Sequence, residues 1–193
     1  MADLARQPAP RRARVAEAFA RRRARVAEVL ARRRVPLGFI VAAATLALAQ
    51  PTWRTWQIGL AVALAGEIIR VWAAGHLEKG REVTRSGPYR WTRHPLYVGS
   101  TVIALGVVIA SRSVAVAVAA AAYMASTLTA AVTVEETFLR STFGGTYDDY
   151  AAARATPVPR RLSWARVVEN REYRAVAGLL IGFALLALKL ILR

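Results

Sequence analysis

The sequence contains no cysteine, and its only histidines are His76 and His94. Without cysteine the chain forms no disulfide and offers no thiolate as a nucleophile or a metal ligand. Two histidines are too few for a histidine-rich metal centre, so we expect no metal site. Lysine is scarce as well, since Lys79 and Lys189 are the only two, and the basic character of the chain therefore comes from arginine.

Long apolar runs separate the charged segments of the chain. Hydrophobic residues make up 55% of the sequence although its formal net charge is +16, a combination that is unusual for a soluble domain. A helix needs about 20 apolar residues to cross a bilayer. The second, fourth and fifth runs have that length, and flanking Pro, Thr, Trp and Tyr residues extend the other two. The sequence therefore predicts an all-α polytopic integral membrane protein with about five transmembrane helices, near 36–49, 56–74, 96–110, 114–134 and 175–192.

Segments that are rich in basic residues alternate along the chain with segments that contain few. The rich segments are 1–34, 75–95 and 135–174, whereas the turns at 50–55 and 111–113 contain one arginine each. Since basic residues are retained on the cytosolic side, we expect the N-terminus and both long loops there and the C-terminus outside. The Ala- and Arg-rich composition is typical of GC-rich genomes, so we expect a bacterial inner (cell) membrane.

The N-terminal segment 1–34 contains eleven arginines and an internal repeat of eleven residues. Arg14-Val15-Ala16-Glu17 recurs as Arg25-Val26-Ala27-Glu28, which places apolar residues near one stripe of a helix. This pattern predicts a basic amphipathic helix lying on anionic lipid headgroups, or alternatively a disordered basic tail. Residues 35–193 would form the membrane domain. We expect no nucleic-acid partner, because the arginines flank the spans instead of lining a soluble face.

Two polar clusters lie at the ends of adjacent predicted spans. Ser111-Arg112-Ser113 is short enough to join the spans 96–110 and 114–134 into a helical hairpin. The far ends of this hairpin carry Arg93-His94-Pro95 and Glu135-Glu136, so we expect these clusters to meet in a cytosolic pocket.

The chemistry of both clusters suits a charged cofactor. Pro95 fits the first turn of a helix, whose free N–H groups attract an anion, and Arg93 strengthens that attraction. Neighbouring residues on a helix point about 100° apart. One of Glu135 and Glu136 could therefore accept hydrogen bonds from a ribose diol while the other meets loop arginines. The alternative is ordinary membrane anchoring by arginines and an aromatic belt, with solvated carboxylates.

Residues 70–160 resemble the isoprenylcysteine carboxyl methyltransferase family and, more loosely, the phospholipid methyltransferases. The ordered motifs that carry this resemblance are Gly87-Pro88-Tyr89, Arg93-His94-Pro95-x-Tyr97, a helical hairpin, Glu135-Glu136 with Leu139, Phe143-Gly144, Tyr147-x-x-Tyr150, and Pro157 or Pro159.

The resemblance implies an S-adenosyl-L-methionine-dependent methyltransferase that acts on a lipophilic acceptor at the cytosolic membrane face. Tyr89 and Tyr97 could pack on the adenine or near the sulfonium, and His76 could line the same pocket or contact headgroups. The implied catalytic residues are Arg93, His94 and Glu136, and the implied cofactor-binding residues are His76, Tyr89, Arg93, His94, Pro95, Tyr97, Glu135 and Glu136.

The methyl acceptor stays open at this stage. A carboxylate acceptor requires no base, whereas an amine must lose a proton, for which His94 and Glu136 are the nearby candidates. Glu67 lies about 10 Å inside the second span by helical rise. It either pairs with Arg70 or lines the path of a lipid acceptor that enters between spans.

Two other functions are compatible with this architecture. Some sterol reductases resemble it but use a nicotinamide cofactor, and tight binding of such a nucleotide would favour a membrane reductase. A non-catalytic membrane protein that retains the fold would not bind the methyl donor.

Overall fold

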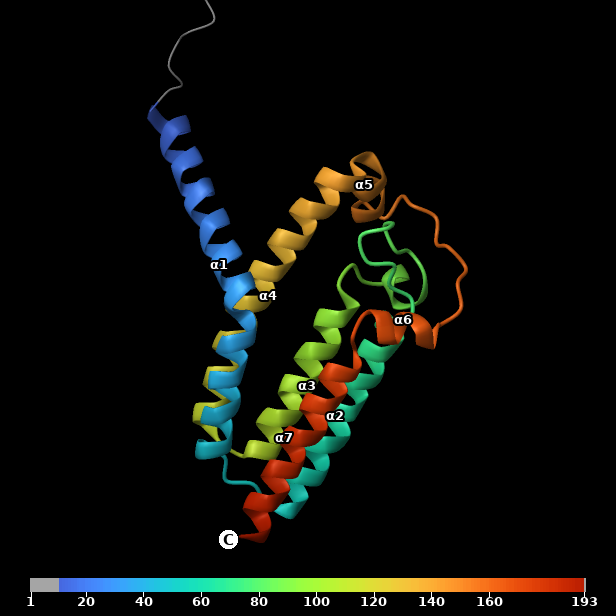
Figure 1. Ribbon diagram of the computed structural model, residues 1–193. Coiled ribbons are helices and arrows are strands. Elements are labelled where there is room, and N and C mark those ends of the chain that lie inside the picture. Colours follow the sequence, from blue (N-terminus) through green and yellow to red (C-terminus); the bar gives the residue numbers. More distant parts are fainter. Residues whose placement is uncertain (1–10, 193) are drawn as a thin grey trace, which may run out of the picture.

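The computed structural model describes residues 11–192, except for the side chains of residues 11–21, 23 and 24. All regular structure in the described residues is helical (Figure 1). The helices are α1 (Arg11–Leu48), α2 (Trp53–Ala74), the short 3-10 helix η1 (Gly87–Arg90), α3 (Pro95–Ser111), α4 (Val114–Phe143), α5 (Gly145–Ala151), α6 (Trp164–Glu169) and α7 (Tyr173–Ile191).

Five long helices correspond to the five predicted apolar runs. Helices α2, α4 and α7 are long and apolar enough to cross a membrane, whereas α3 is apolar but has only 17 residues. These are the same three runs that meet the length criterion in the sequence. The all-α, polytopic membrane fold is thus confirmed, and the number of five spans remains a prediction.

Helix α1 differs from the prediction because it does not separate the basic segment from the first apolar run. It continues from Arg11 to Leu48 with Pro36 inside it. Good helix formers, the arginines at 32–34 and Leu37, lie on the two sides of this proline and favour a single helix. No element therefore ends at the proposed domain boundary between residues 34 and 35. That boundary remains a prediction, and the part of it that concerns residues 1–10 lies outside the described residues.

Glycines allow α2 and α3 to pack with their backbones close together. A Cβ atom on Gly59 would lie 2.5 Å from the carbonyl oxygen of Gly106, and one on Gly66 would lie 2.7 Å from that of Gly99. Small residues at matching positions are a common means of close helix contact in membranes, where apolar surface alone provides little driving force. The glycine face of α3 is therefore occupied by α2.

Helix α4 packs mainly along α1, as Figure 1 shows for its first half. The contact is close at Gly38, where a Cβ atom would lie 2.9 Å from the hydroxyl of Tyr123. The predicted hairpin of α3 and α4 is therefore less tight than expected along its length, because each helix packs on another partner. Its two far ends nevertheless meet, as the site below shows.

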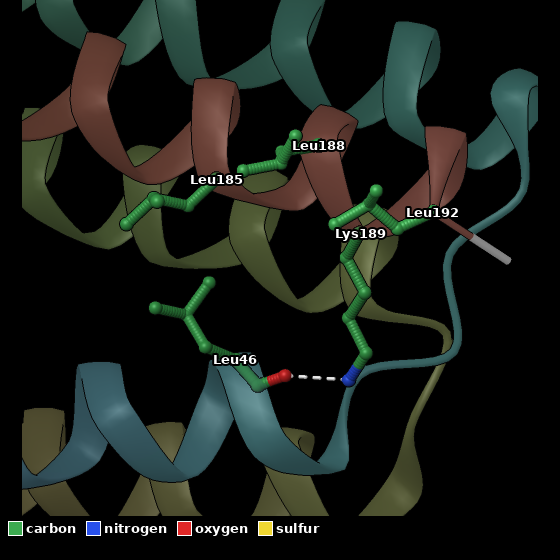
Figure 2. A pocket seen from close by; sticks show the side chains of 5 residues that line it. All are labelled: Leu46, Leu185, Leu188, Lys189 and Leu192. Atoms are coloured by element: carbon green, nitrogen blue, oxygen red, sulfur yellow. Dashed lines mark hydrogen bonds between the residues drawn. The ribbon is translucent and has the colours of Figure 1, made fainter.

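Helix α7 joins the bundle at both of its ends. In its second half, the indole of Trp56 donates a hydrogen bond of 2.9 Å to the carbonyl of Phe183. Lys189 donates to the carbonyl of Leu46, as Figure 2 shows, and also to that of Ala47. Both carbonyls lie in the last turn of α1, where a positive charge is favourable. The cavity beside it has a volume of about 360 Å³ and contains none of the predicted site residues; its lining is Leu46, Leu185, Leu188, Lys189 and Leu192.

A buried ionic network fixes the first end of α7. The guanidinium of Arg70 lies 2.6 Å from the carboxylate of Glu172 and also donates to the hydroxyl of Ser100. The carboxylate of Glu67 is 3.9 Å from the same guanidinium, and both of its oxygens are buried without a hydrogen-bond partner. Arg70 therefore neutralises Glu172 more directly than the Glu67 with which the sequence predicts it to pair.

Candidate functional site

The loop between α2 and α3 is held in shape by His76. Gly87 has a positive φ of 54°, and a Cβ atom there would lie 2.6 Å from the imidazole ring of His76. The two ring nitrogens lie 2.9 Å from the carbonyl of Trp72 and 3.2 Å from that of Arg160. The structure thus brings His76 together with backbone groups of the loops, and not with His94.

Ion pairs from the segment that follows α5 give the loop between α2 and α3 further support. Arg160 lies 2.8 Å from the carboxylate of Glu82, and Arg166 lies 3.2 Å from that of Glu78. The hydrogen bond that Arg160 donates to Glu82 raises the pKa of Arg160, which keeps this guanidinium charged. The loop 75–94 is therefore tied to the loop 152–163 through Arg160 and to α6 through Arg166.

The predicted meeting of the two polar clusters occurs at this end of the bundle. His94 immediately precedes α3, and Pro95 occupies the first position of the helix. The Nε2 atom of His94 lies 3.3 Å from Glu136, and the guanidinium of Arg93 lies 2.8 Å from the same carboxylate. Residues that are about 40 positions apart in the sequence are thereby joined.

The two adjacent glutamates point to different partners. The hydroxyl of Tyr97 donates a hydrogen bond of 2.7 Å to Glu135. Glu136 instead pairs with Arg93 and, at 3.9 Å, with Arg140. The side chain of Glu135 is 42% exposed, whereas that of Glu136 is 18% exposed. Glu135 is therefore the carboxylate with room for an additional hydrogen-bond donor.

His94 lies between both carboxylates and stacks on Tyr97, with ring centres 5.5 Å apart. Burial lowers the pKa of His94, but the nearby carboxylates of Glu135 and Glu136 outweigh this effect and raise it above the ordinary value of 6.5. The Nδ1 atom is buried without a hydrogen bond and lies 3.7 Å from Glu135. His94 is thus held close to two negative charges and retains a polar atom that can bind another group.

Helix α5 covers the site with two tyrosines. The hydroxyl of Tyr150 donates a hydrogen bond of 2.8 Å to the backbone carbonyl of Tyr89, and Tyr147 is fully buried beside it. The side chain of Tyr89 is itself buried, and this burial raises the pKa of its hydroxyl, which stays protonated. Tyr150 is absent from the predicted site residues, although the Tyr147-x-x-Tyr150 spacing was the signal for it.

The described side chains are chemically suited to a zwitterionic ligand that also carries a diol. No side chain caps the N-terminus of α3, and Arg93 beside it is 43% exposed. An anion can therefore bind between that helix end and the guanidinium. Glu135 can accept hydroxyl hydrogens on the other side. His94 and Tyr97, whose rings stack on each other, supply ring surface at the site, whereas Tyr89 is buried.

Comparison with known proteins identifies a family for the chain. The sequence model of the family described as phospholipid methyltransferase matches residues 39–146, which is more than half of the 193 residues. The matched segment includes both polar clusters and the helices that carry them. No curated protein and no solved structure matches the chain. The resemblance found in the sequence is thereby confirmed at the level of the family.

Proposed function

The chain belongs to the phospholipid methyltransferase family, and on this basis we propose that it transfers a methyl group from S-adenosylmethionine to a lipophilic acceptor. Membership of this family and the three membrane-crossing helices make it an integral membrane methyltransferase. The observation that carries the finer proposal is the junction of Arg93, His94 and Glu136, which joins the start of α3 to the end of α4.

The proposed binding mode follows from which groups are already paired. The N-terminus of α3 and Arg93 hold the methionine carboxylate, and Pro95 sets the direction of that helix end. Glu135 holds the ribose hydroxyls, because Glu136 is engaged by two arginines. Tyr89 and Tyr97 line the adenine and sulfonium positions, and His76 shapes the pocket through the loop that it supports.

S-adenosylmethionine supplies a methyl group that its sulfonium has already activated. The protein then has to position the acceptor in line and exclude water. An acceptor carboxylate needs nothing further, whereas an amine must lose a proton. The raised pKa of His94 keeps more of it protonated at neutral pH than a free histidine. This protonation favours Glu136 as the base for an amine acceptor.

The location follows from the positive-inside distribution of arginine and lysine. We place the site on the cytosolic face of a bacterial inner membrane, with anionic headgroups around the basic segments. The acceptor would reach the site from the lipid, because the polar cluster lies at the boundary of the apolar helices α3 and α4. Prenylated cysteine is one acceptor of suitable chemistry and a phospholipid headgroup is another.

Calorimetry of S-adenosylmethionine binding to the detergent-purified protein tests this proposal. We expect micromolar binding that His94→Ala abolishes. Arg90→Ala is the matched control, since Arg90 is exposed in the same loop and should bind as the wild type does. Absence of binding to folded wild-type protein would contradict the proposal. Tight binding of a nicotinamide nucleotide would then indicate a reductase, and no nucleotide binding at all would indicate a non-catalytic membrane protein.

A further inference from the structure

Glu67 lies inside the bundle, where α2, α3 and α7 run side by side (Figure 1). The residue is only 6% exposed, and both of its carboxylate oxygens are buried without a hydrogen-bond partner among the described residues. Each other carboxylate whose side chain the structure describes lies 3.3 Å or less from a cationic or hydroxyl donor. Glu67 has instead only the guanidinium of Arg70, at 3.9 Å.

The guanidinium of Arg70 is already engaged by other groups. Its Nε atom donates to Glu172 at 2.6 Å. Its Nη1 atom donates to the hydroxyl of Ser100 and, at 3.4 Å, to the carbonyl of Leu96. Arg70 therefore joins α2 to the start of α7 and to the first turns of α3. One positive charge is thus set against the two carboxylates of Glu67 and Glu172, and Glu172 is the closer of the two.

The other titratable groups on the helices packed against α2 are engaged elsewhere. Tyr97 of α3 donates to Glu135 of α4, and both charged residues of α6 pair with the loop that follows α2. Burial of Tyr89 in η1 raises the pKa of its hydroxyl, which stays uncharged. The remaining titratable side chains of η1 and α7 lie at the surface or bind α1 at the far end of the bundle; these are Arg90, Tyr173, Arg174 and Lys189. Arg70 and Glu172 are thus the described charges that face Glu67.

An ionised Glu67 would leave one negative charge uncompensated inside the membrane domain. An unpaired charge is far more costly to bury than a neutral carboxylic acid. Directly beside Glu67, Gly66 packs closely on Gly99 and Ile103, which holds α2 and α3 together at this level. A single proton restores the charge balance, because it converts two carboxylates and one guanidinium into one ion pair and one neutral acid.

We propose that Glu67 is a proton-binding site within the membrane domain, and that its bound proton lets Arg70 stay on Glu172. Loss of the proton would place a second negative charge beside Arg70, whose guanidinium would then be shared between α2 and α7. The site is separate from the groups proposed to hold the methyl donor, and the assignment does not rest on the methyltransferase function.

Infrared spectroscopy of the full chain in detergent tests this proposal. A protonated carboxyl group has a carbonyl stretching band that ionised carboxylates and amides lack. We expect this band in the wild type at neutral pH, and we expect it to disappear as the pH is raised. The difference spectrum between the wild type and Glu67→Gln should contain the band, since glutamine has nearly the shape of the neutral acid but no acidic proton.

Two further variants separate charge balance from burial alone. Glu169→Gln is the matched control, because Glu169 is an exposed carboxylate of α6 that pairs with Arg81, and its loss should leave the band as in the wild type. Glu172→Gln leaves Arg70 with Glu67 as its remaining carboxylate partner. Glu67 should then be ionised, and the band should be lost at neutral pH. Circular dichroism shows beforehand that each variant is helical.

Absence of the band from the wild type at neutral pH would overturn the proposal without any variant. A band that persists in Glu67→Gln would overturn it as well, because another carboxyl group would then carry the proton. A band that persists in Glu172→Gln would refute the part assigned to Arg70, and loss of the band in Glu169→Gln would show that the effect is not specific to this site. S-adenosylmethionine takes no part in these measurements, so their outcome is independent of the test of methyl-donor binding.

Discussion

Replacing each of the two adjacent glutamates by glutamine should affect methyl-donor binding unequally. Glu135→Gln removes the charge from the carboxylate that the structure leaves 42% exposed. A hydrogen bond to a charged group contributes about 1.5–3 kcal/mol, so loss of the ribose contact should weaken S-adenosylmethionine binding by about 10- to 100-fold. Glu136→Gln removes the partner of Arg93, which is itself partly exposed, and solvent replaces most of what is lost. We expect a change of only a few-fold for that variant.

Calorimetry with both purified variants, after thermal unfolding has shown that each is folded, measures this difference. Binding of adenosine, which keeps the diol but lacks the methionine group, provides the control for the ribose contact. Glu135→Gln should weaken adenosine binding as well, whereas Arg93→Ala should not. Equal and negligible losses in both glutamine variants would refute the ribose contact. A larger loss in Glu136→Gln would assign the diol to the other carboxylate.

Three further predictions concern stability. The pKa of His94 is raised in the folded protein, so stabilisation by its carboxylate contacts is complete below pH 6.5 and is lost as the pH rises through the raised value; His94→Gln should remove this part of the pH dependence of the unfolding temperature. Gly66→Val should lower the free energy of unfolding by about 1–3 kcal/mol, because backbone atoms of α3 lie 2.7 Å from the new Cβ. In a denaturation assay Gly178→Val, which has open space around it, should have no effect. Arg70→Ala should cost about 3–5 kcal/mol, since it leaves two buried carboxylates unpaired, and Glu67→Gln should leave the unfolding midpoint unchanged or raise it.

The sequence predicts the helices of this protein well because bilayer thickness imposes a length on each apolar run. The runs near 56–74, 114–134 and 175–192 correspond to the three helices that meet the membrane criteria. The junction of His94 with Glu136 was also predictable. The turn at residues 111–113 is so short that α3 and α4 must run antiparallel, which places the start of α3 and the end of α4 at the same end of the bundle. Topology alone therefore identified which polar clusters meet.

Helix pairing was not predictable in the same way. It depends on which faces of the helices match in shape, as Gly66 and Gly99 do in the contact of α2 with α3. Composition likewise could not assign Arg70 to Glu172, since these residues are about 100 positions apart and nearer carboxylates were available. His76 could not be assigned from its place at the end of a span, because its contacts depend on Gly87 and on the carbonyl of Arg160.

The packing of the helices also indicates which part of the chain is separate from the proposed donor site. The groups proposed to hold the methyl donor lie at the start of α3 and the end of α4, both inside the family-matched residues 39–146. The first part of α1 precedes that segment, and Tyr123 of α4 donates a hydrogen bond to the backbone carbonyl of Arg34 there. Exchanging residues 11–35 between family members should therefore leave S-adenosylmethionine affinity constant in calorimetry, and a loss of that affinity would show that the start of α1 contributes to the donor site.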